Sequence, residues 1–200
     1  MSNQASSAGR PDAAPTSASE FFESYLPAWF AQASNGKVTS PGSLVFHVGP
    51  DSHALRLDAG KLEVTRGATT DAILQVSLSP ADFAALIREG ATLLDSGDAD
   101  RLLALRSLSL DPERAKAIRN VDGSVAFEVA ESDGVRTLLL SPGAALAGAS
   151  APSCTVQIAG GDFWALSRGE RNPFELLMEG KIHIQGRMEV AMALSSVLVG

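Results

Sequence analysis

The chain has 200 residues, of which 45% are hydrophobic and 20% are charged, and its formal net charge is −7. These proportions are ordinary for a globular protein. The net negative charge and the lack of a basic cluster argue against binding to nucleic acid or to an anionic membrane surface, because such partners have phosphates that basic residues must neutralise. A single cysteine, Cys154, excludes an intrachain disulfide and fits a reducing compartment, so we expect a cytoplasmic location.

The first 18 residues are rich in Ser, Ala and Pro. We expect a flexible tail there, not a signal peptide or a membrane anchor, because the segment has no apolar core. No later stretch reaches the roughly 18 uninterrupted apolar residues that a spanning helix needs. The sequence therefore predicts no integral membrane segment.

A helix is predicted to begin at Ser17-Ala18-Ser19-Glu20, which has the pattern of a capping box, and to end at Asn35-Gly36. Pro27 should kink this helix because proline has no backbone donor. Five of the eleven aromatic residues of the chain lie between Phe21 and Phe30. This aromatic stripe indicates either core packing or a docking face for a protein partner near Phe22, Trp29 and Phe30.

From Ser43 onwards, apolar residues alternate with a period of two, which predicts four short strands separated by glycine-containing turns. A helix follows, with Ser79 as its cap and Pro80 at its first position. The next elements predicted are a helix from Ala99 to Leu105, a short strand from Ser107 to Leu110 and a helix from Asp111 to about Arg119.

The same order of elements is predicted a second time. Strands are expected at Val125 to Val129, Val135 to Leu140, Ala144 to Ala147 and Thr155 to Ile158, followed by helices at Asp162 to Ser167 and Pro173 to Met178, a strand at Lys181 to Gln185 and a helix from Arg187 to about Val197.

Sequence blocks repeat along with the elements. Gly42 to Val48 matches Gly123 to Val129 at a shift of 81 (127 − 46), and Asp82 to Leu86 matches Asp162 to Leu166 at a shift of 80 (162 − 82). We therefore predict an α+β fold of two repeats, each a roughly five-stranded sheet covered by helices. The expected organisation is a tail at 1–18, a divergent first repeat at 19–121 and a second repeat at 122–200.

The second repeat ends in a recognisable pattern. It consists of Thr155-Val156-Gln157-Ile158, Asp162-Phe163, Leu166, Arg168-Gly169, Asn172-Pro173, Gly180-Lys181-Ile182, Ile184, Gly186 and the helix from Met188 to Leu194. Over about Ser153 to Leu198 this pattern resembles the sterol carrier protein type 2 family. The resemblance implies a small α+β domain whose sheet and helices enclose an apolar tunnel for sterols, fatty acids or fatty acyl-CoA, here in tandem duplication.

A ligand-binding surface is predicted mainly in the second repeat. Ile182 and Ile184 share one face of a strand, and methionines on the last helix suit a variable hydrocarbon. The same stripes are also compatible with ordinary core packing. The residues predicted to contact an apolar ligand are Phe163, Leu166, Phe174, Leu177, Met178, Ile182, Ile184, Met188, Met192 and Leu198.

The first repeat departs from this pattern. Asp100 stands where the second repeat has Phe174, and Arg106 stands where it has Gly180. An unpaired carboxylate in an apolar cavity is costly. We therefore expect the first repeat to be a structural partner, with any ligand in the second repeat or between the two.

No catalytic residue, metal or cofactor is predicted. His47, His53 and His183 have no Cys or acid at the spacing of metal ligands, and Ser141 and Cys154 have no histidine nearby in the sequence. Three functions stay open: a non-enzymatic carrier of a fatty acid, fatty acyl-CoA or sterol-like lipid, an accessory module with a filled cavity, and an enzyme acting on an apolar substrate in the same cavity.

Overall fold

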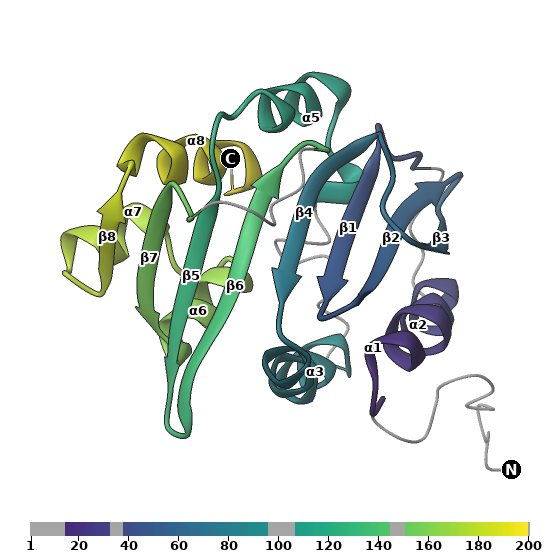
Figure 1. Cartoon of the computed structure of the whole chain (residues 1–200), viewed down its shortest axis with the longest axis horizontal. Coiled ribbons are helices and arrows are strands. Elements are labelled where there is room, and N and C mark those ends of the chain that lie inside the picture. The colour runs from purple at the N-terminus through teal and green to yellow at the C-terminus, as the bar shows by residue number, and fades with distance from the viewer. Residues whose placement is uncertain (1–14, 33–37, 96–106, 145–150, 200) are drawn as a thin grey trace, which may run out of the picture.

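The computed structural model describes residues 15–32, 38–95, 107–144 and 151–199 and has an α+β fold with one mixed sheet (Figure 1), which confirms the predicted fold class. The sheet has eight strands in the order β3-β2-β1-β4-β6-β5-β7-β8. They are β1 (Ser43–Val48), β2 (Asp51–Asp58), β3 (Lys61–Arg66), β4 (Ala72–Leu78), β5 (Val125–Glu131), β6 (Gly134–Pro142), β7 (Cys154–Ala159) and β8 (Ile182–Gly186).

Helical segments precede and follow the strands of each half. They are α1 (Ala18–Glu20), the π-helical turn η1 (Phe21–Tyr25), α2 (Leu26–Gln32), α3 (Pro80–Asp95), the 3₁₀ turn η3 (Ser107–Ser109), α5 (Pro112–Arg119), α6 (Gly160–Ser167), α7 (Pro173–Met178) and α8 (Met188–Val199).

The two halves of the sheet share one pairing pattern. β1 pairs antiparallel with β2 and parallel with β4, while β5 pairs antiparallel with β6 and parallel with β7. Phe46 lies opposite Val76, and Phe127 lies opposite Val156, at separations of 81 (127 − 46) and 80 (156 − 76) between the halves. This register supports the internal repeat, although a tandem duplication stays a prediction.

β4 and β6 join the halves. They pair antiparallel, with Val76 opposite Leu140 and Leu78 opposite Leu138. In the second half, β8 pairs with β7, so the strand predicted at Ser107 to Leu110 would by analogy pair with β4. However, β6 already occupies that edge of β4. The segment instead forms η3 and a short connection. Each half contributes four strands to the described sheet, where about five were expected.

Two other predicted elements cannot be compared. The helix at Ala99 to Leu105 lies outside the described residues, as do Asp100 and Arg106. The strand at Ala144 to Ala147 also lies outside them, apart from Ala144, which is in a turn.

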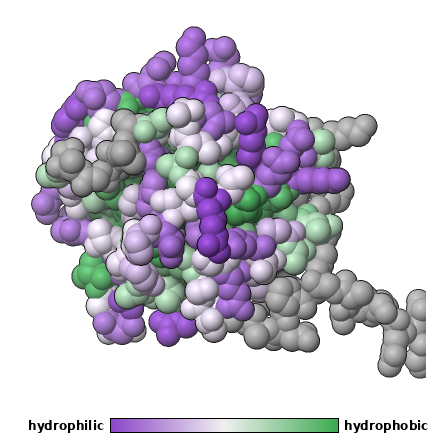
Figure 2. Space-filling model, turned by 45° about the vertical axis from the view of Figure 1, so that its right-hand side comes forward, coloured by the Kyte–Doolittle hydropathy of each residue, from purple (hydrophilic) through white to green (hydrophobic). Residues whose placement is uncertain are grey.

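The core lies on one face of the sheet. Apolar side chains at alternate positions of the strands form one cluster with buried residues of α3, α5, α6, α7 and α8, and α6 lies behind β5 and β6 in Figure 1. Val45, Ala54 and Ala72 form a separate small cluster. In Figure 2, polar residues cover most of the visible side, with small apolar areas between them.

The N-terminal helical segment begins as predicted and then widens. The Ser17 hydroxyl accepts a hydrogen bond from the Glu20 amide at 3.1 Å, but the Glu20 carboxylate accepts from the Thr16 amide at 2.8 Å, one residue earlier than a capping box would place it. The π-helical turn η1 ends two residues before Pro27. Proline has no backbone N–H to donate to the preceding turn of a helix, and this accounts for an irregular turn beside it. The π-helical turn thus lies next to the position where a kink was predicted.

The aromatic stripe of this segment packs inward. Phe22 is fully buried, and its ring centroid lies 4.9 Å from that of Phe46, 5.0 Å from that of His53 and 5.3 Å from that of Phe83. Phe30 is buried as well, and Trp29 is half-buried against the core. These contacts favour the core interpretation, and a partner surface near Phe22, Trp29 and Phe30 is not supported.

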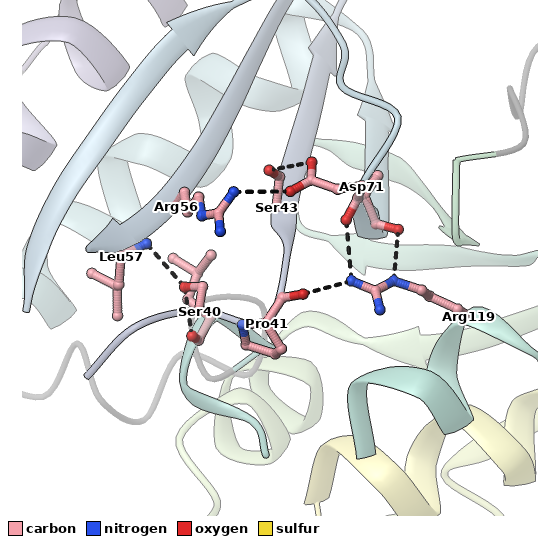
Figure 3. Close-up of polar contacts among 9 residues, drawn as sticks. Ser40, Pro41, Ser43, Arg56, Leu57, Asp71 and Arg119 are labelled. Atoms are coloured by element: carbon pink, nitrogen blue, oxygen red, sulfur yellow. Dashed lines mark hydrogen bonds and ion pairs between the residues drawn. The ribbon is translucent and has the colours of Figure 1, made fainter. Parts of the chain in front are cut away.

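Arg119, on the helix between the two halves, binds the start of the first half-sheet (Figure 3). Its Nη2 donates to the carbonyl oxygens of Pro41 at 2.8 Å and Asp71 at 3.2 Å, and its Nε donates to that of Ala72 at 3.4 Å. Three carbonyls that precede or begin β1 and β4 thus share one guanidinium, which holds α5 against the sheet.

We predict that Gly42→Ala will lower the free energy of unfolding by about 2 kcal/mol, because a Cβ at this position would overlap the Arg119 guanidinium and the backbone oxygen of Asp71. Urea unfolding measures the change. Gly161→Ala is the matched control, since a Cβ there has no neighbour within 4 Å and alanine favours the helix. Equal stability of the Gly42 variant and the wild type would contradict the prediction.

A second prediction concerns Asp71. Burial alone would raise the pKa of Asp71, but the hydrogen bond from the Ser43 hydroxyl and the charge of Arg56 help to outweigh it, so the pKa lies below its ordinary value. A lowered carboxyl pKa stabilises the folded state above the unfolded-state pKa, and this contribution disappears as the pH falls through the folded-state pKa. Asp71→Asn should therefore cost about 1 kcal/mol at pH ~7, and the difference from wild type should shrink as the pH falls to about 3. Urea unfolding at both pH values tests this, and a constant difference would refute it.

Candidate functional site

Three helices cover the apolar face of the second half. α6 contacts β5 and β7, α7 contacts β8, and α8 contacts β7. α7 begins as the sequence predicts, with the Asn172 side-chain oxygen accepting from the Phe174 amide at 2.8 Å and Pro173 at the first position. α6 has no side-chain cap. The helices enclose a layer of side chains against the sheet.

The structure brings five of the ten predicted ligand residues into this layer. Leu166 and Ile182 are buried, with 7% and 6% of their surface exposed. Phe163, Leu177 and Ile184 are half-buried against the same core, and the ring centroid of Phe163 lies 6.2 Å from that of Phe127 on β5. These five residues form the inner group of the candidate site.

Four other predicted residues lie on the surface. Phe174 is 57% exposed and Met178 is 74% exposed, both on α7, while Met188 and Met192 on α8 are 46% and 43% exposed. In each helix the two residues are four positions apart and so lie on one side of it. We call these four residues the outer apolar group. The tenth residue, Leu198, belongs to α8, but its side chain is not among those described.

The buried side of α8 differs from the stripe that the sequence indicated. Val190 and Leu194 are 2% and 3% exposed, whereas Met188 and Met192 face outward. Leu176 on α7 is fully buried beside the predicted Leu177. The spacing of Val190 and Leu194 by four residues is a helical signal, but a helix that is apolar on two sides does not reveal which side meets the sheet.

Cys154 also lies in this layer and is buried. Burial raises the pKa of its thiol above 9.0, although a hydrogen bond from the Ala191 backbone lowers it and the charge of Glu189 raises it further. A thiol with a raised pKa is a poor nucleophile at neutral pH. Among the described residues, no group of three or more His, Cys, Asp or Glu side chains is placed to hold a metal ion.

We predict that Cys154 will resist a thiol reagent such as 5,5′-dithiobis(2-nitrobenzoic acid) in the folded protein, because the thiol is buried and its pKa is raised. One equivalent should react after unfolding in urea, which is the internal control. Absorbance at the thionitrobenzoate band measures the reaction. Complete labelling of the folded protein within minutes would contradict the burial of this side chain.

One hollow between the two halves is small and has a mixed polar and apolar lining. It has a volume of about 130 Å³ and lies between α3, the β5–β6 hairpin and α6. Its lining includes Leu86, Arg88, Glu131, Asp133, Arg136 and Trp164, so charges of both signs surround it. Pockets for drug-sized ligands usually measure about 300 Å³ or more and are mostly apolar. The hollow is therefore smaller than a usual pocket for a drug-sized ligand.

Ion pairs involve several charged residues of the segment from Arg171 to Glu189. The Arg171 guanidinium lies 2.7 Å from the Glu179 carboxylate, and Lys181 lies 3.3 Å from Glu179 and 3.6 Å from Asp162. Hydrogen bonds from Arg171 and Lys181 hold the pKa of Glu179 below its ordinary value. Arg187 lies 2.8 Å from Glu189 and lowers the pKa of that carboxyl in the same way.

Comparison with known protein families identifies one match. The model of the SCP-2 sterol transfer family matches residues 99–199. This range covers the second half and begins within the segment that the sequence assigned to the first repeat. No curated protein matches the chain. In the part of the chain that the structure describes, no helix combines the length and the apolar character needed to cross a membrane.

Several solved structures are similar to part of the chain. The crystal structure of sterol carrier protein 2-like 2 from Aedes aegypti has 23% identity and a TM-score of 0.39, covering 56% of this chain and 98% of its own. Apo sterol carrier protein 2 from Yarrowia lipolytica has 17% identity and a TM-score of 0.37, covering 55% and 89%. The solution structure of palmitated SCP2L2 from Aedes aegypti has 21% identity and a TM-score of 0.39, covering 51% and 95%.

Proposed function

Because the chain belongs to the SCP-2 sterol transfer family, whose model matches 101 of its 200 residues (199 − 99 + 1), we propose that it binds and carries a long apolar lipid without converting it. The family supports lipid binding and transfer in general. The observation that carries the proposal for this chain is the layer under α6, α7 and α8, where the inner group packs and the outer apolar group borders it.

The proposed ligand is a fatty acid, a fatty acyl-CoA or a sterol-like lipid. Its hydrocarbon would lie among the half-buried side chains Phe163, Leu177 and Ile184, which can change rotamer more readily than the fully buried Leu176. Transfer from water to an apolar site favours binding by about 0.8 kcal/mol per buried methylene. A long chain therefore gains several kcal/mol after the costs of ordering, and no cofactor is needed.

The first half is proposed as the supporting half. Its core contains the ring of Phe22, whose centroid lies 4.9 Å from that of Phe46 and 5.3 Å from that of Phe83. Aromatic rings at these separations fill the space between helices and sheet. This packing supports a division of roles in which 122–200 binds the ligand and 19–121 stabilises the sheet. We expect both halves to act in the cytoplasm.

A second candidate is an accessory module with a filled cavity. Leu166, Leu176 and Ile182 are 7%, 0% and 6% exposed, so the protein's own side chains already occupy much of the layer under α6 and α7. In this case the lipid-binding fold would serve only as a scaffold. Ligand uptake separates the two candidates.

We predict that a fluorescent fatty acyl probe will bind saturably to the full chain and that Phe174→Asp and Met192→Glu will each weaken its binding by about tenfold or more, because a charge beside hydrocarbon is costly. Both side chains are exposed, so the variants should fold normally, which circular dichroism checks. Val135→Asp is the matched control, since Val135 is 59% exposed and lies on β6, outside the proposed site.

Mass spectrometry under native conditions provides an independent measurement. The carrier should retain lipid from the cells in which it is produced, and the wild type should show more of it than the Phe174 variant. Absence of any lipid, together with a probe that never saturates, would reject the carrier function and favour the accessory module.

A further inference from the structure

We propose that Arg119 is a positioning residue for ligand binding: it fastens α5 to the first half-sheet, and α5 in turn holds α8 in place over the second half. This inference rests on the proposed carrying of a lipid and deepens it. It assigns a part in ligand binding to a residue that belongs to neither the inner group nor the outer apolar group, and it connects the supporting half to the ligand layer.

α5 buries little apolar surface of its own. It has eight residues, of which Ala115 and Ile118 are buried. Isolated helices shorter than about 12 residues are marginal in water, and an alanine with one isoleucine adds only a small apolar area. The position of α5 therefore depends strongly on polar contacts.

The Arg119 side chain makes such contacts from the last position of α5 (Figure 3). Its guanidinium donates to the carbonyl oxygens of Pro41, Asp71 and Ala72 at 2.8, 3.2 and 3.4 Å. Gly42 leaves room for it, since a Cβ at that position would overlap Nη2. Hydrogen bonds from a charged donor are strong, and the planar guanidinium can reach several acceptors at once. The helix is thus tied to the first half-sheet, although it lies within the range 99–199 that matches the family.

α5 also contacts α8, and Figure 1 shows both helices at the same end of the sheet. Ala115 and Ile118 of α5 belong to the same core cluster as Val190 and Leu194 of α8. α8 contacts β7 as well. Two supports therefore hold this helix: the sheet of its own half and the helix that Arg119 ties to the other half.

The start of α8 has a further anchor within the second half. The Arg187 amide donates to the Ser153 carbonyl at 2.8 Å. The Arg187 guanidinium lies 3.4 Å from the Asp122 carboxylate, but these side chains are 49% and 95% exposed, and exposed ion pairs contribute little. α8 continues for twelve residues to Val199, so the part beyond its start needs support from packing, which the contact with α5 helps to supply.

A loosened α8 would weaken ligand binding. Val190 and Leu194 are 2% and 3% exposed on the buried side of this helix, which covers the ligand layer. If the helix is mobile in the free protein, it must be ordered when a ligand binds, and this ordering costs conformational entropy. Removal of the Arg119 donors should therefore raise the Kd without changing any residue of the proposed layer.

Hydrogen exchange of the ligand-free full chain tests the support of α8. The amides of α8 are compared with those of β5 in the same protein, which separates local opening from a change in global stability. Arg119→Met removes the donors, and exchange in α8 should accelerate relative to β5 by about tenfold. Arg119→Lys keeps a charged donor and should give a smaller change in the same direction, and it decides the test if circular dichroism shows that the Met variant is unfolded.

Val48→Ala is the matched control for a loss of stability in the first half. Val48 is 3% exposed and ends β1, at the opposite end of the strand from Ser43 and hence from the carbonyls that Arg119 binds. This variant should be less stable than the wild type but should keep the α8-to-β5 exchange ratio. An unchanged ratio in the Arg119 variants, or an equal change in Val48→Ala, would overturn the proposal.

The fluorescent fatty acyl probe gives the second measurement. Its Kd should rise about fivefold in Arg119→Met, because binding must now order α8, and should stay near the wild-type value in Val48→Ala. An unchanged Kd in a variant with faster α8 exchange would also overturn the proposal. A wild type that does not bind the probe rejects the carrier function instead, and the exchange ratio still decides whether Arg119 holds α8.

Discussion

The pairing of β4 with β6 is the constraint on which the rest of the structure depends. Without it, each half would be a four-stranded sheet with a small core, and small cores bury too little surface to be very stable. The pair aligns Val76 with Leu140 and Leu78 with Leu138, so the apolar faces of the two half-sheets become continuous. One core cluster then extends from Phe22 on η1 to Leu194 on α8.

This pairing also makes the two ends of the sheet different. β3 ends the sheet on the first side and is contacted by α2, whereas β8 ends it on the other side, between the exposed residues of α7 and α8. The halves share a pairing pattern, but only the second half has the outer apolar group beside a sheet edge. The candidate site follows from that asymmetry.

Local signals predicted most of the elements, because they depend on neighbouring residues. α7 begins after Asn172 and ends at Met178 as predicted, since a side-chain cap and a proline define its start. α5 likewise begins after the capping residue Asp111. The strand predicted at Ser107 to Leu110 was wrong, because whether a strand forms there depends on a free edge of β4, and β6 takes that edge from more than twenty residues away along the chain.

The sequence by itself determined the α+β class, the internal repeat pattern and the family resemblance of the second half, because periodicity, caps and motif residues are local properties. Only the tertiary structure decided that Leu166 and Ile182 lie inside while Phe174 and Met178 lie outside. All four are apolar residues at plausible helix or strand positions, so their sequence pattern does not distinguish them. Their exposure depends on where α6, α7 and β8 pack on a sheet that both halves build together.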